Sequence, residues 1–195
     1  MAKWKVGITG GIGSGKTYCA RIFSYLGIAV YNADQRAKWI MHHDGEVRAR
    51  LIGLLGPDVF DRQGNLDKDF MRKRVFGDAT LRQEINAIVH PAVGKDYKRW
   101  HEQQQTPYTL KEAALLVESG SYKELDHLIM VQSPIPLRIQ RIMARDHISI
   151  SEIRNRMRTQ LPESEKSRAS NLFIDNSGCF PILPQIVAIH IKLLE

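Results

Sequence analysis

Cysteine is scarce in this chain: two residues, Cys19 and Cys179, stand among 195. Two cysteines that fit no metal-ligand spacing exclude a disulfide-rich secreted scaffold, so we expect a reducing compartment. The chain also lacks an apolar run of 18 residues, and its first residues lack the apolar segment of a secretory signal. These absences predict a cytoplasmic protein that does not associate with membranes.

Acidic residues are outnumbered, because 28 Lys and Arg face 21 Asp and Glu, for a formal net charge of +7. An excess of positive charge suits nucleic acid, an anionic membrane surface or a small polyanionic ligand. Hydrophobic residues make up 43% of the chain, which is enough for a sizeable core and disfavours a disordered protein. The length suits one domain, with room for a small mobile appendage.

Glycine, by contrast, is concentrated near the N-terminus, where the segment GITGGIGSGK spans residues 7–16. Glycine loses the most conformational freedom on folding, so such a segment needs a function that outweighs this cost. Together with the next residue it contains the pattern G-x-x-x-x-G-K-[ST], the phosphate-binding loop of nucleoside triphosphate enzymes. We predict that its members bind ATP: Gly10, Gly11, Ile12, Gly13, Ser14, Gly15, Lys16 and Thr17.

A phosphate loop requires glycine because backbone N–H groups must converge on phosphate oxygens that side chains would obstruct. Lys16 can reach the terminal phosphates as a catalytic cation, and Thr17 can hold Mg²⁺ through its hydroxyl, partly through water. The alternative is a chance glycine-rich turn, but the pattern lies between a predicted strand and a predicted helix, as a phosphate loop must. The Lys-Thr ending also disfavours a dinucleotide-binding fold.

The hydrophobic pattern around this loop predicts the fold class. Residues 5–8 read as a strand, and Cys19, Ile22, Phe23 and Leu26 form one stripe of a helix that Gly27 ends. Residues 28–31 read as a second buried strand, which we expect next to the loop-bearing strand, and residues 32–34 as the turn beyond it. Strand, helix and strand in this order predict an α/β protein with a parallel sheet flanked by helices. With the phosphate loop, we assign it to the P-loop nucleoside triphosphate hydrolase or kinase type with a helical lid.

Further elements follow along the chain. We predict helices at residues 47–55, 67–76, 81–89, 92–105 and 136–145, after a capping box of Ser149 and Glu152, and from Pro184 onward. Pro91 is expected to break the third of these, leaving His90 at its end. For the final helix we expect one apolar face, made of Ile182, Ile186, Ile189 and Leu193. Strands are expected at residues 113–117, 127–131 and 172–174. The whole reads as a single domain, residues 1–195, with a helical acceptor-side insertion at about 36–108 and a lid at about 136–165.

Arginines define the predicted lid. Arg138, Arg141 and Arg145 recur at helical spacing, and we place Ile139, Ile142 and Met143 on another face of the same helix. The next predicted helix carries Arg154, Arg156 and Arg158. The planar guanidinium suits phosphates, so two basic helices joined by a short turn predict a mobile lid that closes over phosphates. The alternatives are a solvated helix face and a nucleic-acid patch. No aromatic residue lies between 136 and 161, which disfavours nucleic acid.

An ordered set of short motifs runs along nearly the whole chain. It comprises ITGGIGSGKT at residues 8–17, Asn-Ala-Asp at 32–34, HP at 90–91, LLVE at 115–118, QR at 140–141, RD at 145–146, QLP at 160–162 and DNSG at 175–178. In this order they resemble the dephospho-coenzyme A kinase family, which are P-loop kinases of the nucleoside-monophosphate kinase type. The resemblance implies transfer of the γ-phosphate of ATP, with Mg²⁺, to the ribose 3′-hydroxyl of dephospho-coenzyme A.

The resemblance also implies roles for particular residues. Asp34 would be catalytic, as proton acceptor or by orienting the attacking oxygen, and Arg145 would act from the lid. Arg141 and Asn176 would bind ATP, and Thr9, Asp34, His90 and Glu118 would bind the acceptor. Four of these residues have a plain alternative: a helix cap for Asp34, a helix-dipole partner for His90, a strand-end carboxylate for Glu118 and an Asx turn at residues 176–178 for Asn176.

The chain departs from the family pattern at two positions. Ala114 stands where proline is common, and Gln132 stands where an acidic residue is common, so no metal role is assigned there. His42, His43 and Asp44 are adjacent and do not face one point, so we predict a solvated helix end there and no metal site. Two other functions stay open: another small-molecule or nucleotide kinase of this fold, and a nucleotide-dependent nucleic-acid binder. For the kinase we expect a monomer whose partners are ATP and dephospho-coenzyme A, without nucleic acid.

Overall fold

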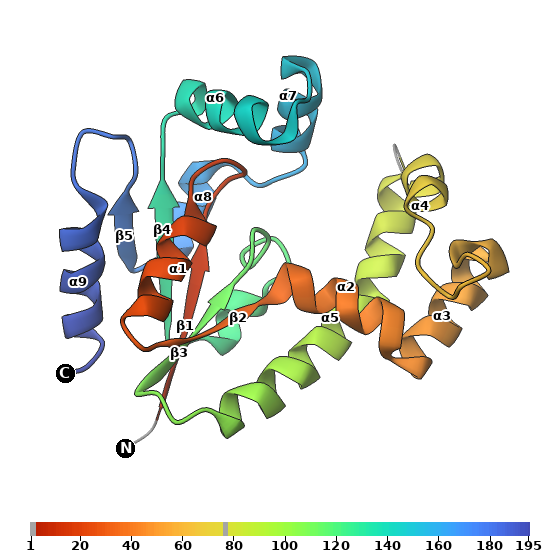
Figure 1. Ribbon diagram of the computed structural model, residues 1–195, viewed down its shortest axis with the longest axis horizontal. Helices are drawn as coiled ribbons and strands as arrows, with labels where there is room; N and C mark the ends of the chain where they lie inside the picture. The colour runs from red at the N-terminus through yellow and green to blue at the C-terminus, as the bar shows by residue number, and fades with distance from the viewer. Residues whose placement is uncertain (1–2, 76–77) are drawn as a thin grey trace. The chain divides into compact units, whose positions relative to one another are not determined.

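A computed structural model describes residues 3–75 and 78–195 of the chain (Figure 1). The chain forms two compact units. The first comprises Met1–Asn32 and Gln103–Glu195, and the second is Ala33–Glu102. No helix in the described ranges is long and apolar enough to cross a membrane.

The first unit is built on a parallel sheet. Its strands within the described residues are β1 (Trp4–Thr9), β2 (Ala29–Asn32), β3 (Tyr108–Glu112), β4 (His127–Gln132) and β5 (Leu172–Asp175), in the spatial order β2-β3-β1-β4-β5. Every neighbouring pair is parallel. The carboxyl ends of the strands therefore meet at one edge of the sheet, where the arrowheads lie in Figure 1. The predicted α/β fold class is confirmed.

Helices cover both faces of this sheet. They are α1 (Lys16–Tyr25), α6 (Ile135–Asp146), α7 (Ile150–Arg158), α8 (Glu163–Ala169) and α9 (Ile182–Lys192), with a 3₁₀ turn η2 (Ser121–Glu124). Helices α1 and α9 lie on one face and α8 on the other (Figure 1). The predicted capping box at Ser149 begins α7 as expected.

Alternate strand residues and one stripe of each covering helix make the core. Val6, Ile8 and Ile129 are fully buried beneath α1, which contributes Cys19 and Phe23. Helix α9 adds Ile186, Ile189 and Leu193, so the stripe predicted for it is confirmed. The helix begins at Ile182, two residues earlier than predicted, and that side chain packs against the same core.

The predicted strand at residues 113–117 is wrong. Ala113 follows the end of β3, and a turn occupies the next residues. The true strand, Tyr-Thr-Leu-Lys-Glu, ends in Lys111 and Glu112, both only 4% exposed. Buried strands are predicted from runs or alternation of apolar residues. The two charged residues interrupt that pattern, so the strand was not predicted. Since β3 lies between β1 and β2, the expectation that β2 is next to the loop-bearing strand is also wrong.

The second unit is helical. Its elements within the described residues are α2 (Ala33–His43), α3 (Gly45–Leu55), the 3₁₀ turn η1 (Pro57–Val59), α4 (Lys68–Val75) and α5, which runs Ala79–Gln103 into the first unit. The turn predicted at residues 32–34 is wrong, because α2 begins directly after β2. The helix predicted at residues 67–76 corresponds to α4, and Phe76 lies outside the described residues. Asp44 caps α3 by accepting a hydrogen bond from the backbone N–H of Val47.

Helix α5 passes through Pro91 without ending there, so the predicted break is wrong and the helices at residues 81–89 and 92–105 are one. Proline removes one N–H donor from the helix ladder. Ile85, Val89, Val93 and Tyr97 recur every four residues and are all buried, so one apolar face continues across the proline. Burial of that face outweighs the local cost.

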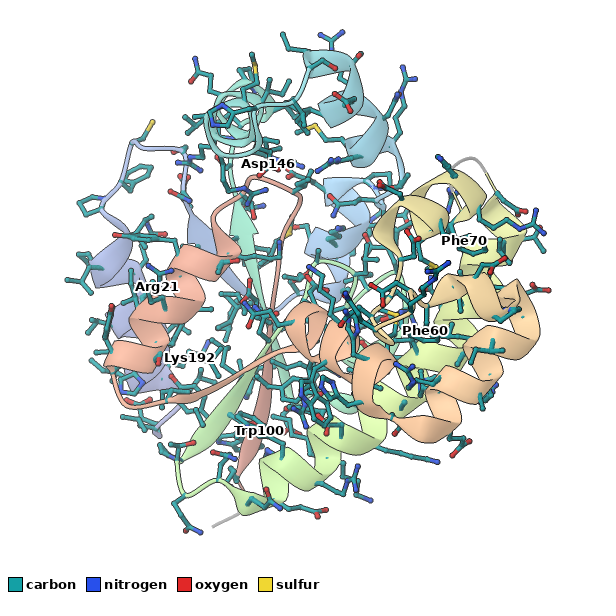
Figure 2. The ribbon with its side chains drawn as sticks, turned by 45° about the vertical axis from the view of Figure 1, so that its right-hand side comes forward. Arg21, Phe60, Phe70, Trp100, Asp146 and Lys192 are labelled. Carbon is teal, nitrogen blue, oxygen red and sulfur yellow. The ribbon has the colours of Figure 1, made fainter. Side chains whose placement is uncertain are left out.

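Side-chain pairs fasten the helices of the second unit together. Arg36 of α2 makes a two-pronged ion pair with Asp96 of α5, at N–O distances of 2.7 and 2.9 Å. The Arg48 guanidinium of α3 lies 4.0 Å above the centre of the Phe60 ring, which is labelled in Figure 2. A planar cation over an aromatic face is favourable, so both arginines have structural roles here.

Candidate active site

The phosphate loop joins the end of β1 to the first turn of α1. Gly13 and Gly15 have φ angles of 80° and 93°, in the left-handed region that side chains disfavour. Gly15 precedes α1 directly, and Lys16 and Thr17 are that helix's first two residues. The predicted order of strand, glycine loop and helix is confirmed, and a helix N-terminus directly after such a loop is a favourable place for an anion.

The glycines also admit other parts of the protein. A Cβ atom at Gly11 would overlap the guanidinium of Arg138, and one at Gly15 would overlap the side-chain amide of Asn176. A Cβ atom at Gly13 would lie 2.7 Å from the backbone oxygen of Arg138. The sequence analysis attributed these glycines to the phosphates alone. Close packing of α6 and of the segment after β5 is a second reason for them.

Arg138 is a site residue that the sequence analysis grouped with the lid and assigned no contact. Its side chain is 5% exposed, and its Nε donates to the backbone oxygen of Ile12 at 2.9 Å. Its Nη1 is paired with Glu163 at the start of α8. Burial lowers the pKa of the Arg138 guanidinium, and the Glu163 carboxylate opposes that shift.

The predicted division of α6 into an arginine face and an apolar face is therefore wrong in part. Arg138 and Ile142, one turn apart, are both buried, whereas Met143 is 40% exposed. An arginine with an ion-pair partner can be buried beside an isoleucine, which helical spacing alone does not reveal.

Arg141 and Asn176 meet beneath the phosphate loop. Arg141 donates from Nη2 to the backbone and side-chain oxygens of Asn176, at 3.1 and 3.2 Å, and from Nη1 to the Ser133 hydroxyl. The Asn176 amide in turn donates to the backbone oxygen of Ser14 at 2.7 Å. Two residues expected to bind ATP are thus brought to the loop from α6 and from the end of β5.

Glu112 is a second residue that the sequence analysis missed. It ends β3 at the carboxyl edge of the sheet, where the Thr17 hydroxyl donates to its Oε1 and Asn32 donates to its Oε2 at 2.7 Å. Its signal was hidden because the strand that carries it was not recognised. A hydroxyl and a carboxylate side by side are oxygen ligands of the kind that Mg²⁺ takes beside substrate phosphates, so these residues fit the metal.

Glu118 lies in the turn after β3 and is bound from α8. Lys166 is fully buried, and its Nζ lies 2.7 Å from Glu118 Oε1 and 3.3 Å from the backbone oxygen of Ala114. The backbone N–H of Leu161 donates to the same Oε1 at 3.1 Å. Within the described part of the chain, Glu118 Oε2 is buried without a hydrogen-bond partner. The pair therefore fixes the segment between α7 and α8.

Arg145 lies near the end of α6 and is exposed. Its Nε and Nη2 donate to the two carboxylate oxygens of Asp146 at 2.7 and 2.9 Å, and Asp146 is labelled in Figure 2. Arg156 of α7 approaches the same carboxylate at 3.7 Å. These cations lower the pKa of Asp146, chiefly through the hydrogen bond from Arg145, whose own pKa is raised. In this arrangement the guanidinium fork of Arg145 is held by its neighbour.

The other predicted site residues are placed as follows. Thr9 is buried at the end of β1, and its hydroxyl lies 3.5 Å from the backbone oxygen of Ala114. Asp34 and His90 belong to the second unit, where both are exposed, Asp34 in the first turn of α2 and His90 within α5. Cys19 was not a predicted site residue: it packs in the core from α1, where burial raises the pKa of its thiol to about 12.

A hollow of about 290 Å³ opens at the carboxyl ends of β4 and β5. It is lined by Gln132, Ser133, Pro134, Ile135, Glu163, Asp175 and Ser177. Ligands of open parallel sheets bind beyond the carboxyl ends of the strands, so the hollow and the phosphate loop lie at the edge where binding is expected.

The buried pair of Lys166 and Glu118 gives a first prediction. Lys166→Met should lower the free energy of unfolding by about 3–5 kcal/mol, because it leaves a buried carboxylate without its cation. Urea denaturation followed by circular dichroism measures the loss. The double variant Lys166→Met/Glu118→Gln should recover part of it, because no buried charge remains. A loss below 1 kcal/mol in the single variant would show that water solvates the carboxylate.

The chain is similar to known proteins over nearly its whole length. The dephospho-CoA kinase family model matches residues 4–181. The dephospho-CoA kinase of Porphyromonas gingivalis is 38% identical over 185 residues, covering 94% of this chain and 91% of that protein. The corresponding protein of Bacteroides fragilis strain YCH46 is 35% identical over 184 residues, covering 94% and 89%.

Solved structures show the same fold. The Thermus thermophilus protein TT1252 superposes with a TM-score of 0.88 at 28% identity, over the whole of both chains. A dephospho-CoA kinase from Campylobacter jejuni superposes with a TM-score of 0.71 at 21% identity, over 98% of both chains. With the matched family model, the near full-length relatives and the phosphate loop in its strand-to-helix position, this chain belongs to the dephospho-CoA kinase family of P-loop kinases.

Proposed function

We propose that this protein transfers the γ-phosphoryl group of ATP to the ribose 3′-hydroxyl of dephospho-coenzyme A, giving coenzyme A and ADP. The bond between the γ-phosphorus and the β,γ-bridging oxygen breaks, and a bond from the phosphorus to the ribose oxygen forms. The observation that carries the proposal is the phosphate loop, with Lys16 and Thr17 opening α1 and Glu112 beside Thr17. The names of the relatives supply the acceptor.

The loop and α1 bind the ATP phosphates in this proposal. Backbone N–H groups of residues 10–17 and the Lys16 ammonium stabilise negative charge on the transferring group. Arg141 and Asn176 support the loop from behind through the backbone oxygen of Ser14, and they extend the site toward the nucleoside. A set of donors fixed before the reaction needs no reorganisation as charge develops.

Thr17 and Glu112 would hold Mg²⁺ that arrives with ATP, through the hydroxyl and the carboxylate respectively. Magnesium when bound neutralises charge on the phosphate oxygens and orients them. The hydrogen bond from Asn32 keeps the Glu112 carboxylate turned toward Thr17. Because Mg²⁺ retains several waters, two protein oxygens beside the phosphates are a sufficient set.

Asp34 would act on the acceptor, by taking the proton of the ribose hydroxyl or by holding that oxygen in line for attack. It is an exposed carboxylate in the first helical turn after β2. Thr9, His90 and Glu118 complete the proposed acceptor-binding set. Because Oε1 of Glu118 binds Leu161 and Lys166 and Oε2 is buried, Glu118 would serve the acceptor site by fixing the segment between α7 and α8.

The hairpin of α6 and α7 would act as the lid, with Arg145 as its catalytic cation. In the observed arrangement Asp146 accepts two hydrogen bonds from the guanidinium of Arg145, and a phosphate can accept the same bidentate pair. On closure, Arg145 would move from Asp146 to the transferring group. The proposal is of a monomer in the cytosol that works on these two substrates and not on nucleic acid.

Product analysis tests the proposed reaction. Purified protein with MgATP and dephospho-coenzyme A should yield coenzyme A and ADP in equal amounts, measured by chromatography. AMP, shikimate and single-stranded RNA serve as competing acceptors, and Lys16→Ala controls for a contaminating kinase, because it should lower the rate about 10²–10³-fold. Phosphorylation of another acceptor, with no coenzyme A formed, would replace this function by a different kinase activity.

Asp34→Asn tests the acceptor step. The substitution nearly preserves shape, and losing one charge at a helix N-terminus costs only about 0.3–1 kcal/mol. Single-turnover phosphoryl transfer should fall about 10²–10⁴-fold, while ATP affinity measured by titration stays close to wild type. Unchanged transfer in the folded variant would leave Asp34 with a helix-capping role alone.

Arg145→Lys tests the lid. Lysine keeps the positive charge but loses the planar fork, so the chemical step should slow by at least about tenfold while binding of ATP alone changes little. Pre-steady-state quench-flow separates the two quantities. Arg154→Lys, an exposed arginine of α7, is the matched comparison. Equal rates for wild type and Arg145→Lys would show that Arg145 has no catalytic role and belongs to a solvated helix face.

A further inference from the structure

Ile12 stands out in the phosphate loop because side chains from outside the loop bind both of its backbone polar groups. Its N–H donates to Oε1 of Gln160 at 2.9 Å, and its carbonyl oxygen accepts from Nε of Arg138 at 2.9 Å. Gln160 follows α7 and Arg138 lies in α6. Arg138 and Gln160, which we call the base of the proposed lid, therefore bind two successive peptide units of the loop, those on either side of Ile12.

The grip on the Ile12 carbonyl has a geometric consequence for the next residue. A peptide unit is planar and trans, so its carbonyl and its N–H point in opposite directions. Arg138 holds the oxygen of the Ile12–Gly13 peptide, so the Gly13 N–H of that unit points away from Arg138. Gly13 has a φ angle of 80° and no side chain, so its own backbone preferences restrict the Ile12–Gly13 peptide plane little. The orientation of that plane therefore has to come from a hydrogen-bond partner.

Arg138 is itself well fixed. Glu163 at the start of α8 pairs with its Nη1, and the guanidinium lies against Gly11 so closely that a Cβ there would overlap it. The side chain is 5% exposed, so water competes weakly for its hydrogen bonds. A charged donor held in this way makes a stronger bond to a carbonyl than a neutral donor does.

We propose that Arg138, fixed by Glu163, is a positioning residue for phosphate binding: by holding the Ile12 carbonyl it aims the Gly13 N–H at the bound nucleotide's phosphates. The inference rests on the proposed function only for the presence of a nucleotide. Arg138 need not touch the phosphates. Its effect passes through one peptide plane, and it links the loop to the base of the lid hairpin.

The test uses MgADP without acceptor, on the intact protein. Arg138→Gln should raise the dissociation constant of MgADP about tenfold or more. The reason is that the hydrogen bond from the Gly13 N–H to the charged phosphate is weakened when its peptide plane is no longer held. In ¹⁵N-labelled wild-type protein the Gly13 amide proton should move downfield when MgADP binds, since a short bond to phosphate deshields it. In Arg138→Gln that displacement should shrink, whereas a purely structural role for Arg138 would leave it unchanged in the folded protein.

Two further variants keep the result decisive. Glu163→Gln, at a side chain 39% exposed, removes the ion pair and should give an intermediate loss in both readouts even if Arg138→Gln does not fold. Arg168 is an exposed arginine in the same helix α8. Arg168→Gln removes the same positive charge as Arg138→Gln, and its dissociation constant for MgADP should stay within twofold of wild type.

The outcomes separate this inference from the proposed function. Wild-type displacement of Gly13 and wild-type affinity in Arg138→Gln, or in Glu163→Gln if the former does not fold, would overturn the positioning role. Failure of the wild-type protein to bind MgADP would overturn the nucleotide site and this role with it. Binding of MgADP with the predicted pattern, but no coenzyme A formed, would support the role of Arg138 and refute the proposed acceptor.

Discussion

The close approach of helix α6 to the phosphate loop is the constraint on which the site depends. Gly13 has no room for a Cβ beside the backbone oxygen of Arg138, and Gly11 leaves the space that the Arg138 guanidinium occupies. The close approach of the helix therefore depends on glycine in the loop. The same approach brings the Arg138 side chain to Ile12 and the Arg141 side chain to Ser14 and Asn176. A loop with few side chains of its own is thus held in shape by side chains from elsewhere.

The carboxyl edge of the sheet supplies the second half of the site. Because β3 lies between β1 and β2, its last residue, Glu112, is level with Ile8 on one side and Asn32 on the other. Its carboxylate reaches the first turn of α1 at Thr17. A buried carboxylate needs partners, and here they are a hydroxyl and an amide that also lie where metal and phosphate chemistry is expected.

Much of this could be predicted from the sequence, and two of the failures share one physical cause. The loop, the flanking strand and helix, and the α9 stripe follow from local patterns and were confirmed. The unbroken helix at Pro91 was not predicted, because burial of its apolar face outweighs the missing N–H. The strand ending in Lys111 and Glu112 and the burial of Arg138 were not predicted, because their charged side chains are buried. In the sequence of a single strand or helix, a charged residue that is buried beside a partner cannot be told from one that is exposed to solvent.

The packing of Arg138 on Gly11 also bears on how sequences of this family can change. In the observed arrangement, the guanidinium of Arg138 occupies the space that a Cβ at residue 11 would need. A methyl group at residue 11 would therefore displace the guanidinium from its place against the loop. Substitutions at these two positions, 127 residues apart in the chain, should therefore occur together more often than separately.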